Sequence, residues 1–206
     1  MHVLLINGSP HEKGCTYTAL SLVAGELNAA GITTEILNVG TKPVGGCIGC
    51  GGCAKGNGCV FGGVVNEAIE KARAADAFVF GTPVHYASAS GNMTSFLDRL
   101  AYAGGKYLAY KPAAICASAR RAGTTSALDQ LVKYPEFFHM PLVSGSYWPM
   151  VHGSNPEQVL QDEEGCAVMK ELGRNMAWLL QCIEAGKAAG FSHPENPRRP
   201  MTNFIR

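Results

Sequence analysis

Short apolar segments alternate with amphipathic helical segments along most of the chain, and this alternation constrains the fold more than any other feature. Five segments read as buried strands: His2–Asn7, Thr33–Val39, Asp76–Thr82, Pro112–Ser118 and Pro141–Ser146. Helical spacing marks the segments that follow them: Thr16–Ala30, Val64–Ala75, Asn92–Ala103, Thr124–Phe137 and most of Pro156–Ala189. Strands that alternate with helices form βαβ units, in which the strands run parallel. We therefore predict an α/β fold built on a five-stranded parallel sheet.

The predicted elements fit a doubly wound, flavodoxin-like sheet with strand order 2-1-3-4-5. Such sheets bind ligands beyond the carboxyl ends of their strands, where the strand order reverses. Three loops follow strands of the predicted sheet and are rich in glycine and small polar residues: Gly8–Cys15, Pro83–Gly91 and Ala119–Gly123. We expect the ligand site at these loops.

One domain, residues 1–190, accounts for the whole alternation. An insertion at 40–63 follows the second strand and is rich in Gly and Cys, with no hydrophobic periodicity. The tail, residues 191–206, contains three prolines and is expected to be an extended arm. Its apolar Phe204 and Ile205 favour a tail that reaches a second subunit.

Composition excludes several classes of protein. The 206-residue chain is 47% hydrophobic and 16% charged, which suits a full core and not a disordered chain. A formal net charge of +1 gives no basic field, so no nucleic acid is expected as a partner. No apolar run reaches the ~18 residues of a membrane span, so no membrane is expected either. Eight cysteines without a recognisable export signal favour a cytoplasmic protein that uses thiols for metal binding or redox chemistry.

The first loop has the features of a phosphate site. It leads from a strand into a helix, whose first N–H groups and positive dipole end attract an anion. Gly8 and Gly14 allow the backbone to curl, and Ser9 and Thr16 add hydroxyl donors. The alternative is an ordinary loop in which Thr16 caps the helix. No Gly-Lys-Ser/Thr sequence follows, so a nucleoside triphosphate is not expected.

These loops together resemble a known family. Gly8-Ser9-Pro10 with Gly14-x-Thr16 is similar to the phosphate loop of the NADPH-dependent FMN reductase and flavodoxin-like flavoprotein superfamily. Residues 82–86 (TPVHY), 90–93 (SGNM) and 96–99 (FLDR) resemble its second flavin loop, and 117–120 (ASAR) with Gly123 resemble its third. The resemblance covers residues 1 to about 184 and implies a flavodoxin-like fold with bound FMN.

The resemblance implies a set of FMN-binding residues: Ser9, Pro10, Lys13, Gly14, Cys15, Thr16, Pro83, Val84, His85, Tyr86, Ser90, Gly91, Asn92, Met93, Ser118, Ala119, Arg120 and Gly123. Two of them depart from the family pattern. Cys15 stands where the family often has Asn, and His85 where it often has an aromatic residue. Because Cys15 begins a helix, we expect a lowered thiol pKa if it is more than a small packed residue.

The insertion contains the most specific motif in the chain. Its thiols are Cys47, Cys50, Cys53 and Cys59, interspersed with glycines. Four cysteines are the ligand set of a [4Fe–4S] cluster, and the spacing resembles that of iron–sulfur flavoproteins, a branch of the same superfamily. Zinc, which also accepts four cysteines, and metal-free redox thiols remain alternatives. The insertion can fold over the flavin edge of its own sheet or reach a partner subunit. The other cysteines besides Cys15, namely Cys116, Cys166 and Cys182, are expected to be small core residues.

These observations predict an FMN-dependent oxidoreductase that pairs FMN with a [4Fe–4S] cluster. NAD(P)H is a candidate donor, and the remaining partners are small-molecule or protein electron carriers. Candidate catalytic residues are His85, Tyr86, Arg120 and His152. A cluster-free NAD(P)H-dependent reductase of flavin, quinone, azo or nitro compounds is the first alternative. A zinc-binding or thiol-sensing module is the second. We expect a homodimer or a homotetramer.

Overall fold

The computed structural model describes residues 1–197 and 200–204. Residues 198–199 and 205–206, including the Ile205 of the predicted arm, lie outside the described residues. The elements in chain order are β1 (His2–Asn7), α1 (Cys15–Ala29), β2 (Thr33–Asn38), η1 (Gly52–Lys55), α2 (Val64–Ala74), β3 (Ala77–His85), β4 (Ser88–Ala89), α3 (Gly91–Gly104), η2 (Gly105–Tyr107), β5 (Ala113–Ala119), α4 (Thr124–Phe137), β6 (Met150–His152), α5 (Pro156–Val159) and α6 (Glu163–Ala188).

The sheet is parallel along its main path, with the order β2-β1-β3-β5-β6. The short β4 pairs antiparallel with the end of β3 and forms a hairpin beside this path. Without β4 the order of the strands is 2-1-3-4-5, as the sequence predicted. The flavodoxin-like fold is confirmed.

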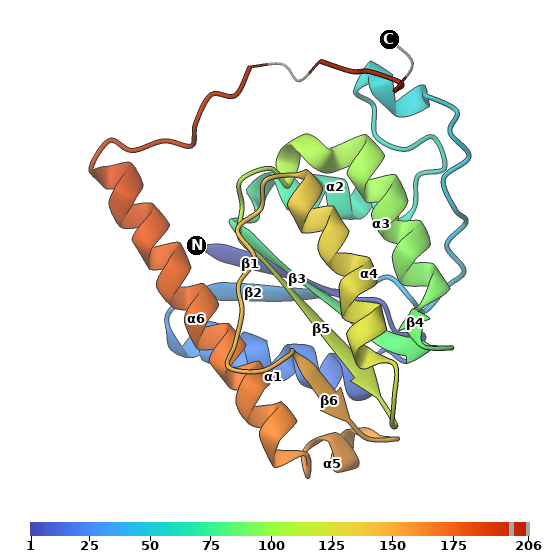
Figure 1. Cartoon of the computed structure of the whole chain (residues 1–206), viewed down its shortest axis with the longest axis vertical. Helices are drawn as coiled ribbons and strands as arrows, with labels where there is room; N and C mark the ends of the chain where they lie inside the picture. The colour runs from blue at the N-terminus through green and yellow to red at the C-terminus, as the bar shows by residue number, and fades with distance from the viewer. Residues whose placement is uncertain (198–199, 205–206) are drawn as a thin grey trace.

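Helices cover both faces of the sheet (Figure 1). On one face α1, α5 and α6 pack over Val3 and Leu5 of β1. On the other face α2, α3 and α4 pack over Leu4 and Ile6 of the same strand. Alternate residues of β1 thus enter two separate cores, and every residue after His2 is buried. A parallel strand covered on both sides requires this continuous apolar run.

The expected fifth strand, residues 141–146, is wrong in position. Only Leu142 makes an isolated parallel bridge, to Ala113 of β5, before the chain leaves the sheet. It returns at β6, where Met150 pairs with Ala117. The apolar run at 141–146 has the composition of a strand. β5 pairs with the chain at Leu142 and again at 150–152, and the segment between them, residues 143–149, is an excursion from the sheet.

The last predicted helix, 156–189, is two helices. The chain leaves helical geometry after α5, and Asp162 begins α6 by accepting a hydrogen bond from the Gly165 N–H. Beyond α6 the described part of the tail contains no helix or strand, and the extended arm stays a prediction. His193 of the tail stacks on Tyr110 at a centroid distance of 4.4 Å, and Phe204 is fully exposed. No helix among the described residues is long and apolar enough to cross a membrane.

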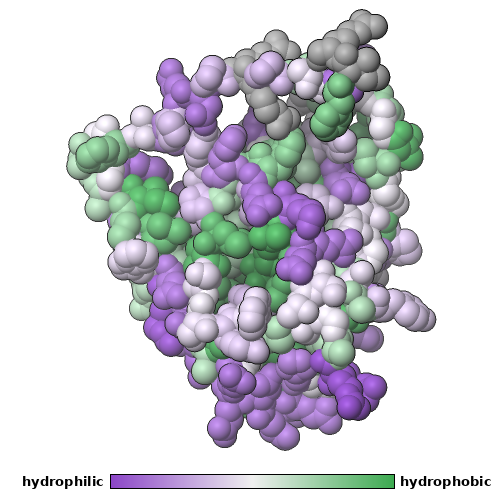
Figure 2. Space-filling view, in the orientation of Figure 1, coloured by the Kyte–Doolittle hydropathy of each residue, from purple (hydrophilic) through white to green (hydrophobic). Residues whose placement is uncertain are grey.

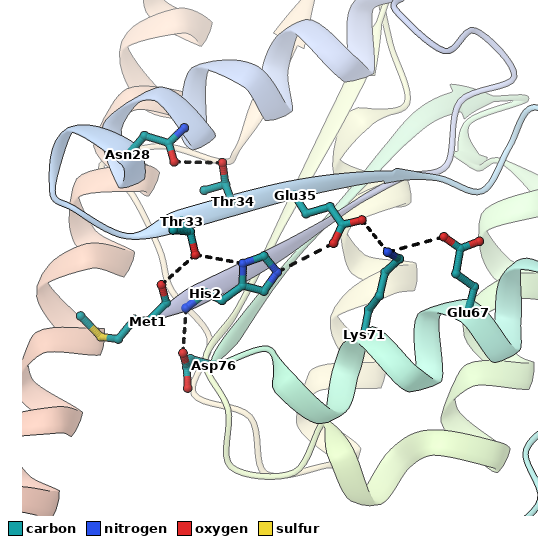
Figure 3. A network of polar contacts seen from close by, with 9 residues as sticks. All are labelled: Met1, His2, Asn28, Thr33, Thr34, Glu35, Glu67, Lys71 and Asp76. Atoms are coloured by element: carbon teal, nitrogen blue, oxygen red, sulfur yellow. Dashed lines mark hydrogen bonds and ion pairs between the residues drawn. The ribbon is translucent and has the colours of Figure 1, made fainter.

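A polar network ties α2 to the outer strand of the sheet (Figure 3). Lys71 of α2 lies 2.6 Å from Glu35 of β2 and 3.6 Å from Glu67. The hydrogen bond to Glu35 raises the pKa of Lys71 above its ordinary value. Since β2 precedes the cysteine insertion and α2 follows it, this contact fixes the two elements that bound the insertion.

The start of the insertion packs tightly on the first loop. A Cβ added to Gly40 would collide with the backbone carbonyl oxygens of Gly8 and Ser9, whereas a Cβ on the exposed helical Gly25 would meet nothing within 4 Å. We predict that Gly40→Ala lowers the free energy of unfolding by ~1–3 kcal/mol because the backbone must shift. Gly25→Ala, the matched control, should raise it by ~0.5–1 kcal/mol. Urea denaturation measures both, and equal effects would contradict this packing.

Candidate functional site

The three predicted ligand loops begin at the same edge of the sheet. Asn7, the last residue of β1, pairs with Gly81 of β3, which in turn pairs with Cys116 of β5. The three central strands therefore end close to one level. The loops after them converge at the carboxyl edge, as the topology predicts.

The first loop is held in shape from within by a buried side chain. The Asn7 amide donates to the Glu12 carbonyl at 3.2 Å, and its oxygen accepts from the Ser9 N–H at 3.1 Å. The Ser9 hydroxyl accepts from the His11 N–H. Sequence reasoning did not single out Asn7 as a site residue, although its place directly before Gly8 at a strand end was the available signal.

The start of α1 is suited to an anion. Gly14 occupies the capping position, no side chain accepts from the free N–H groups, and the first turn has no acidic residue. Thr16 does not cap the helix, so the alternative explanation of Thr16 is wrong. Its hydroxyl shares a 2.8 Å hydrogen bond with the Ser118 hydroxyl and joins the first loop to the third. Uncapped N–H groups and a positive dipole end fit a phosphate group.

The second loop is a hairpin turn supported by buried polar contacts. Ser90 caps α3, donates from its hydroxyl to the Gly8 carbonyl at 2.9 Å and donates from its N–H to Thr82. Met93 is fully buried. Asn92 points to the insertion, where its side chain contacts the backbone of residues 40–44. The side chains of these three residues therefore support the loop, and any contact with FMN stays a prediction.

The tip of this hairpin presents exposed side chains. His85 is exposed, and Tyr86, with a φ of 49°, is fully exposed. Pro83 and Val84 are half-buried beneath them. An exposed aromatic tip at the ligand edge is able to contact the ring of a bound flavin, as the resemblance implies.

The third loop packs on this hairpin. Gly123 has a φ of 98°, and a Cβ there would lie 2.7 Å from the Cα of Ala87. Ala119 is buried and Arg120 exposed. His152 ends β6, and Asp162, which sequence reasoning missed, accepts from its N–H at 2.7 Å and lies 3.6 Å from its Nδ1. The predicted flavin residues thus occupy neighbouring loops at one edge, and Pro10 and Lys13 of the first loop are exposed there.

Cys15 behaves as a packed thiol. Burial raises its pKa above the ordinary value, with a backbone hydrogen bond opposing and Glu157 adding to the rise. The thiol points to the Gly153 carbonyl at 3.5 Å. Of the two readings of Cys15, the small packed residue is the one the structure supports, because desolvation of the thiolate outweighs the N–H groups of the helix.

The four cysteines of the insertion line one cavity. It has a volume of about 220 Å³, roughly seven times the ~30 Å³ that a water molecule occupies in the liquid. The walls include the side chains of Ile48, Val60, Phe61, Arg99 and Tyr102 beside the cysteines Cys47, Cys50, Cys53 and Cys59. Cys47 and Cys50 are exposed, while Cys53 and Cys59 are half-buried. All eight cysteines of the chain are free thiols.

The spacing of these thiols does not match a single ion. Within residues 1–197 and 200–204, no three His, Cys, Asp or Glu side chains are close enough together to hold one metal ion. Zinc bonds to sulfur at ~2.3 Å, so four thiolates around it must nearly touch. In a [4Fe–4S] cluster each cysteine binds a different iron, and the ligands surround a larger volume. Four thiols that line one cavity supply the number of ligands that either group requires.

The cysteine cavity does not lie over the flavin edge of its own chain. The insertion leaves that edge at Gly40 and runs along α3, and the cavity is lined by Arg99, Tyr102 and Ala103 of the distal half of that helix (Figure 1). Nine residues separate Ser90 from Arg99, which corresponds to ~14 Å along a helix. The insertion therefore does not fold over the flavin edge of its own sheet, which was one of the two expected placements.

The remaining cysteines differ from one another. Cys116 is fully buried, and desolvation raises its pKa to about 12, as expected of a core thiol. Cys166 is half-buried and Cys182 exposed on α6, so the expectation of a core position is wrong for Cys182.

A second cavity, of about 530 Å³, lies between α4 and the excursion before β6, where Figure 2 shows an apolar hollow. Its floor includes Ile115 of β5, which pairs with Phe80 of β3 on one side and has no paired strand on the other, where residues 143–149 leave the sheet. None of the predicted flavin or cluster residues lines it. The predicted sites and this hollow are therefore separate features.

Comparison with known proteins decides the family. The model of the NADPH-dependent FMN reductase family matches residues 1–155. The chain belongs to the NADPH-dependent FMN reductase family. As a member it is an FMN-dependent oxidoreductase, and the FMN resemblance inferred from the loops is confirmed.

Two proteins similar to this chain are named iron–sulfur flavoproteins. The chain is 30% identical over 196 residues to an iron–sulfur flavoprotein of Archaeoglobus fulgidus, covering 91% of this chain and 96% of the relative. It is 26% identical over 192 residues to an iron–sulfur flavoprotein of Methanocaldococcus jannaschii, covering 89% and 100%. The solved structure of an NADH:FMN oxidoreductase superposes with a TM-score of 0.61 at 20% identity, covering 88% of this chain and 89% of that one. This last likeness supports the fold.

The geometry predicts where the FMN phosphate binds. In the double variant Ser9→Ala, Thr16→Ala the loop loses two hydroxyls, one of which shapes it and one of which joins it to Ser118. Each of these hydroxyls is also a predicted donor to the FMN phosphate. Because a hydrogen bond to a charged group contributes ~1.5–3 kcal/mol, FMN affinity should fall at least tenfold when both are removed. Thr34→Ala on β2, whose hydroxyl bonds Asn28, is the control and should bind FMN normally. Fluorescence titration measures both, and unchanged affinity in the double variant would place the phosphate elsewhere.

Proposed function

We propose that this FMN-dependent oxidoreductase pairs its flavin with a [4Fe–4S] cluster on Cys47, Cys50, Cys53 and Cys59. Flavins exchange electrons singly or in pairs, and a cluster exchanges them singly. The pair suits electron transfer between a one-electron carrier and a two-electron substrate, with NAD(P)H as a candidate donor. The free thiols favour a reducing compartment, and we place the activity in the cytoplasm.

One observation carries this proposal: all four cysteines of the insertion line the same cavity. The loop that positions them contains glycines in left-handed geometry, among them Gly49, Gly51, Gly56 and Gly58. Such residues let a short segment turn repeatedly, as it must to place four thiols around a compact group. The names of the two archaeal relatives agree with this proposal.

The residues of the flavin edge have separate roles in the proposed reaction. The N–H groups at the start of α1 bind the phosphate, and the hairpin carrying His85 and Tyr86 orients the ring. Arg120, at the end of β5, holds negative charge on the reduced flavin or on a bound nicotinamide phosphate. His152, fixed by Asp162, is the candidate proton donor at this edge. FMN itself supplies the electron-transfer chemistry.

A cluster-free NAD(P)H-dependent reductase is the second candidate. The observation in its favour is the position of the cysteine cavity along α3, away from the chain's own flavin loops. In that case the cysteine loop takes part in thiol chemistry or contributes only to the surface of the protein.

Iron analysis separates the two candidates. After anaerobic preparation with supplied iron and sulfide, we predict about four irons and four acid-labile sulfides per chain, because a cubane needs four thiolates. Changing any one of the four cysteines to Ala should abolish the cluster and leave FMN bound. Cys182→Ala, an exposed thiol on α6, is the matched control and should keep it. Full FMN with no iron and undiminished reductase activity would reject the cluster.

The separation of the two sites within one chain favours a homodimer or homotetramer. In such an assembly the cysteine cavity of one subunit approaches the flavin loops of another. Exposed apolar side chains around the cavity, among them Ile48, Val60, Phe61 and Tyr102, suit burial in an interface. Light scattering should give two or four times the chain mass of 21.8 kDa. Phe61→Ser with Tyr102→Ser should shift it to a smaller species, and a monomeric parent protein would contradict the assembly.

A further inference from the structure

Cys59 is fixed to the scaffold in a way that the other three cysteines are not. The Cys59 N–H donates to the side-chain oxygen of Asn66 at 2.8 Å, and the Asn66 amide donates back to the Cys59 carbonyl at 3.0 Å. Asn66 lies in the first turn of α2, which packs on the sheet core. These two hydrogen bonds tie the backbone of Cys59 to α2.

The side chain of Cys59 is held from a second helix. The Nε of Arg99 in α3 donates to its sulfur at 3.2 Å. The two terminal nitrogens of Arg99 donate to the carbonyl oxygens of Gly45, at 3.3 Å, and Gly62, at 3.1 Å. One guanidinium therefore binds both ends of the cysteine loop and the sulfur between them. Lysine, with a single ammonium group, does not reproduce this planar fork.

Arg99 is a buried cation without an anion. Its exposed fraction is 6%, and within the part of the chain that the structure describes no carboxylate pairs with it. Its neighbours are the two carbonyls, the Cys59 sulfur and the ring of Phe61 at 5.3 Å. The insertion, residues 40–63, contains two lysines and no acidic residue. A buried cation without a counter-charge is costly even when it is hydrogen-bonded, so this position favours a ligand group that brings negative charge.

We propose that Arg99 and Asn66 are positioning residues that fix Cys59 as the anchor of the cysteine loop before iron binds, and that Arg99 supplies the counter-charge to the thiolate-bound cluster. Only the counter-charge role of Arg99 rests on the proposed cluster; the anchoring of Cys59 does not depend on it. Hydrogen bonds and positive charge at cluster sulfurs raise the reduction potential. Arg99 is therefore expected to raise the potential as well as order the loop.

The first test uses the FMN-bound protein without iron. Hydrogen exchange should show the Cys59 amide protected in the parent protein and exchanging at least fivefold faster in Asn66→Ala. In Arg99→Gln, alkylation of Cys59 by iodoacetamide should rise at least fivefold, while the exposed Cys47 and Cys50 keep their rates. The control is Arg174→Gln on α6, whose partner is Glu26, far from the loop in sequence and fold. It should change neither rate.

The second test uses the reconstituted protein and no activity measurement. Arg99→Gln should lose iron to a chelator at least tenfold faster than the parent and show a lower midpoint potential. Arg99→Lys keeps the charge without the fork, so it should lose iron faster but retain a potential nearer the parent's. A purely structural role would leave the potential unchanged in every variant that still binds the cluster.

The outcomes separate the two proposals. If the parent takes up no iron, the cluster fails, and the exchange and alkylation rates still decide whether Cys59 is anchored. Equal rates for parent, Asn66→Ala and Arg99→Gln would overturn the anchoring. Unaltered chelator resistance and potential in Arg99→Gln would overturn the counter-charge role. Circular dichroism of each variant ensures that only folded proteins are compared, and Arg99→Lys serves if Arg99→Gln does not fold.

Discussion

The register of the three central strands is the constraint on which the rest of the structure depends. Because β1, β3 and β5 pair so that Asn7, Gly81 and Cys116 lie side by side, their loops leave the sheet near one level. Buried polar contacts then connect the loops to each other. Ser90 joins the second loop to the first through the Gly8 carbonyl, and Ser118 joins the third to the first through Thr16. A shift of one strand by one residue would exchange its two buried faces and separate these partners.

Helix α3 extends the influence of this edge to the insertion. Its first residues close the flavin loops, and Asn92 holds the start of the insertion. Two turns further on, Arg99 holds both ends of the cysteine loop. The start of α3 therefore contributes to the flavin edge, and its distal half contributes Arg99, Tyr102 and Ala103 to the cysteine cavity. This arrangement explains how an insertion with so few apolar residues has a defined conformation.

Much of the fold was predictable from the sequence, because local composition specifies buried parallel strands well. The limits of β1 and α4 agree with the expected limits, and the strand order follows from the alternation. The fifth strand was misplaced because residues 141–146 have strand composition, whereas the pairing at β6 depends on a β5 edge that no local pattern reveals. Cys182 was misplaced because helical spacing does not indicate which face of α6 is covered.

The parts of the candidate site that are single loops next to strand ends were predictable from the sequence. The parts that depend on contacts between residues distant in the sequence were not. The phosphate loop and the four cysteines were identified from residue type and spacing. Asn66 and Asp162 were not, because each contacts a residue that only the fold brings near it. Arg99 was noted as part of the second flavin-loop motif, whereas the structure places its guanidinium on Cys59, Gly45 and Gly62 of the cysteine loop. For Cys15 the sequence left two readings open, and only the fold decides for the packed thiol, since burial raises its pKa in spite of the helix N-terminus.

The central claim is that one chain provides an FMN site at the carboxyl edge and a cluster site on the insertion. Diffraction at the iron absorption edge from crystals grown anaerobically with FMN tests both halves together. The account predicts anomalous density for iron within the cavity lined by Cys47, Cys50, Cys53 and Cys59, and a flavin phosphate at the start of α1. An iron-free cavity in protein that retains FMN, or a phosphate bound away from the first loop, would contradict it.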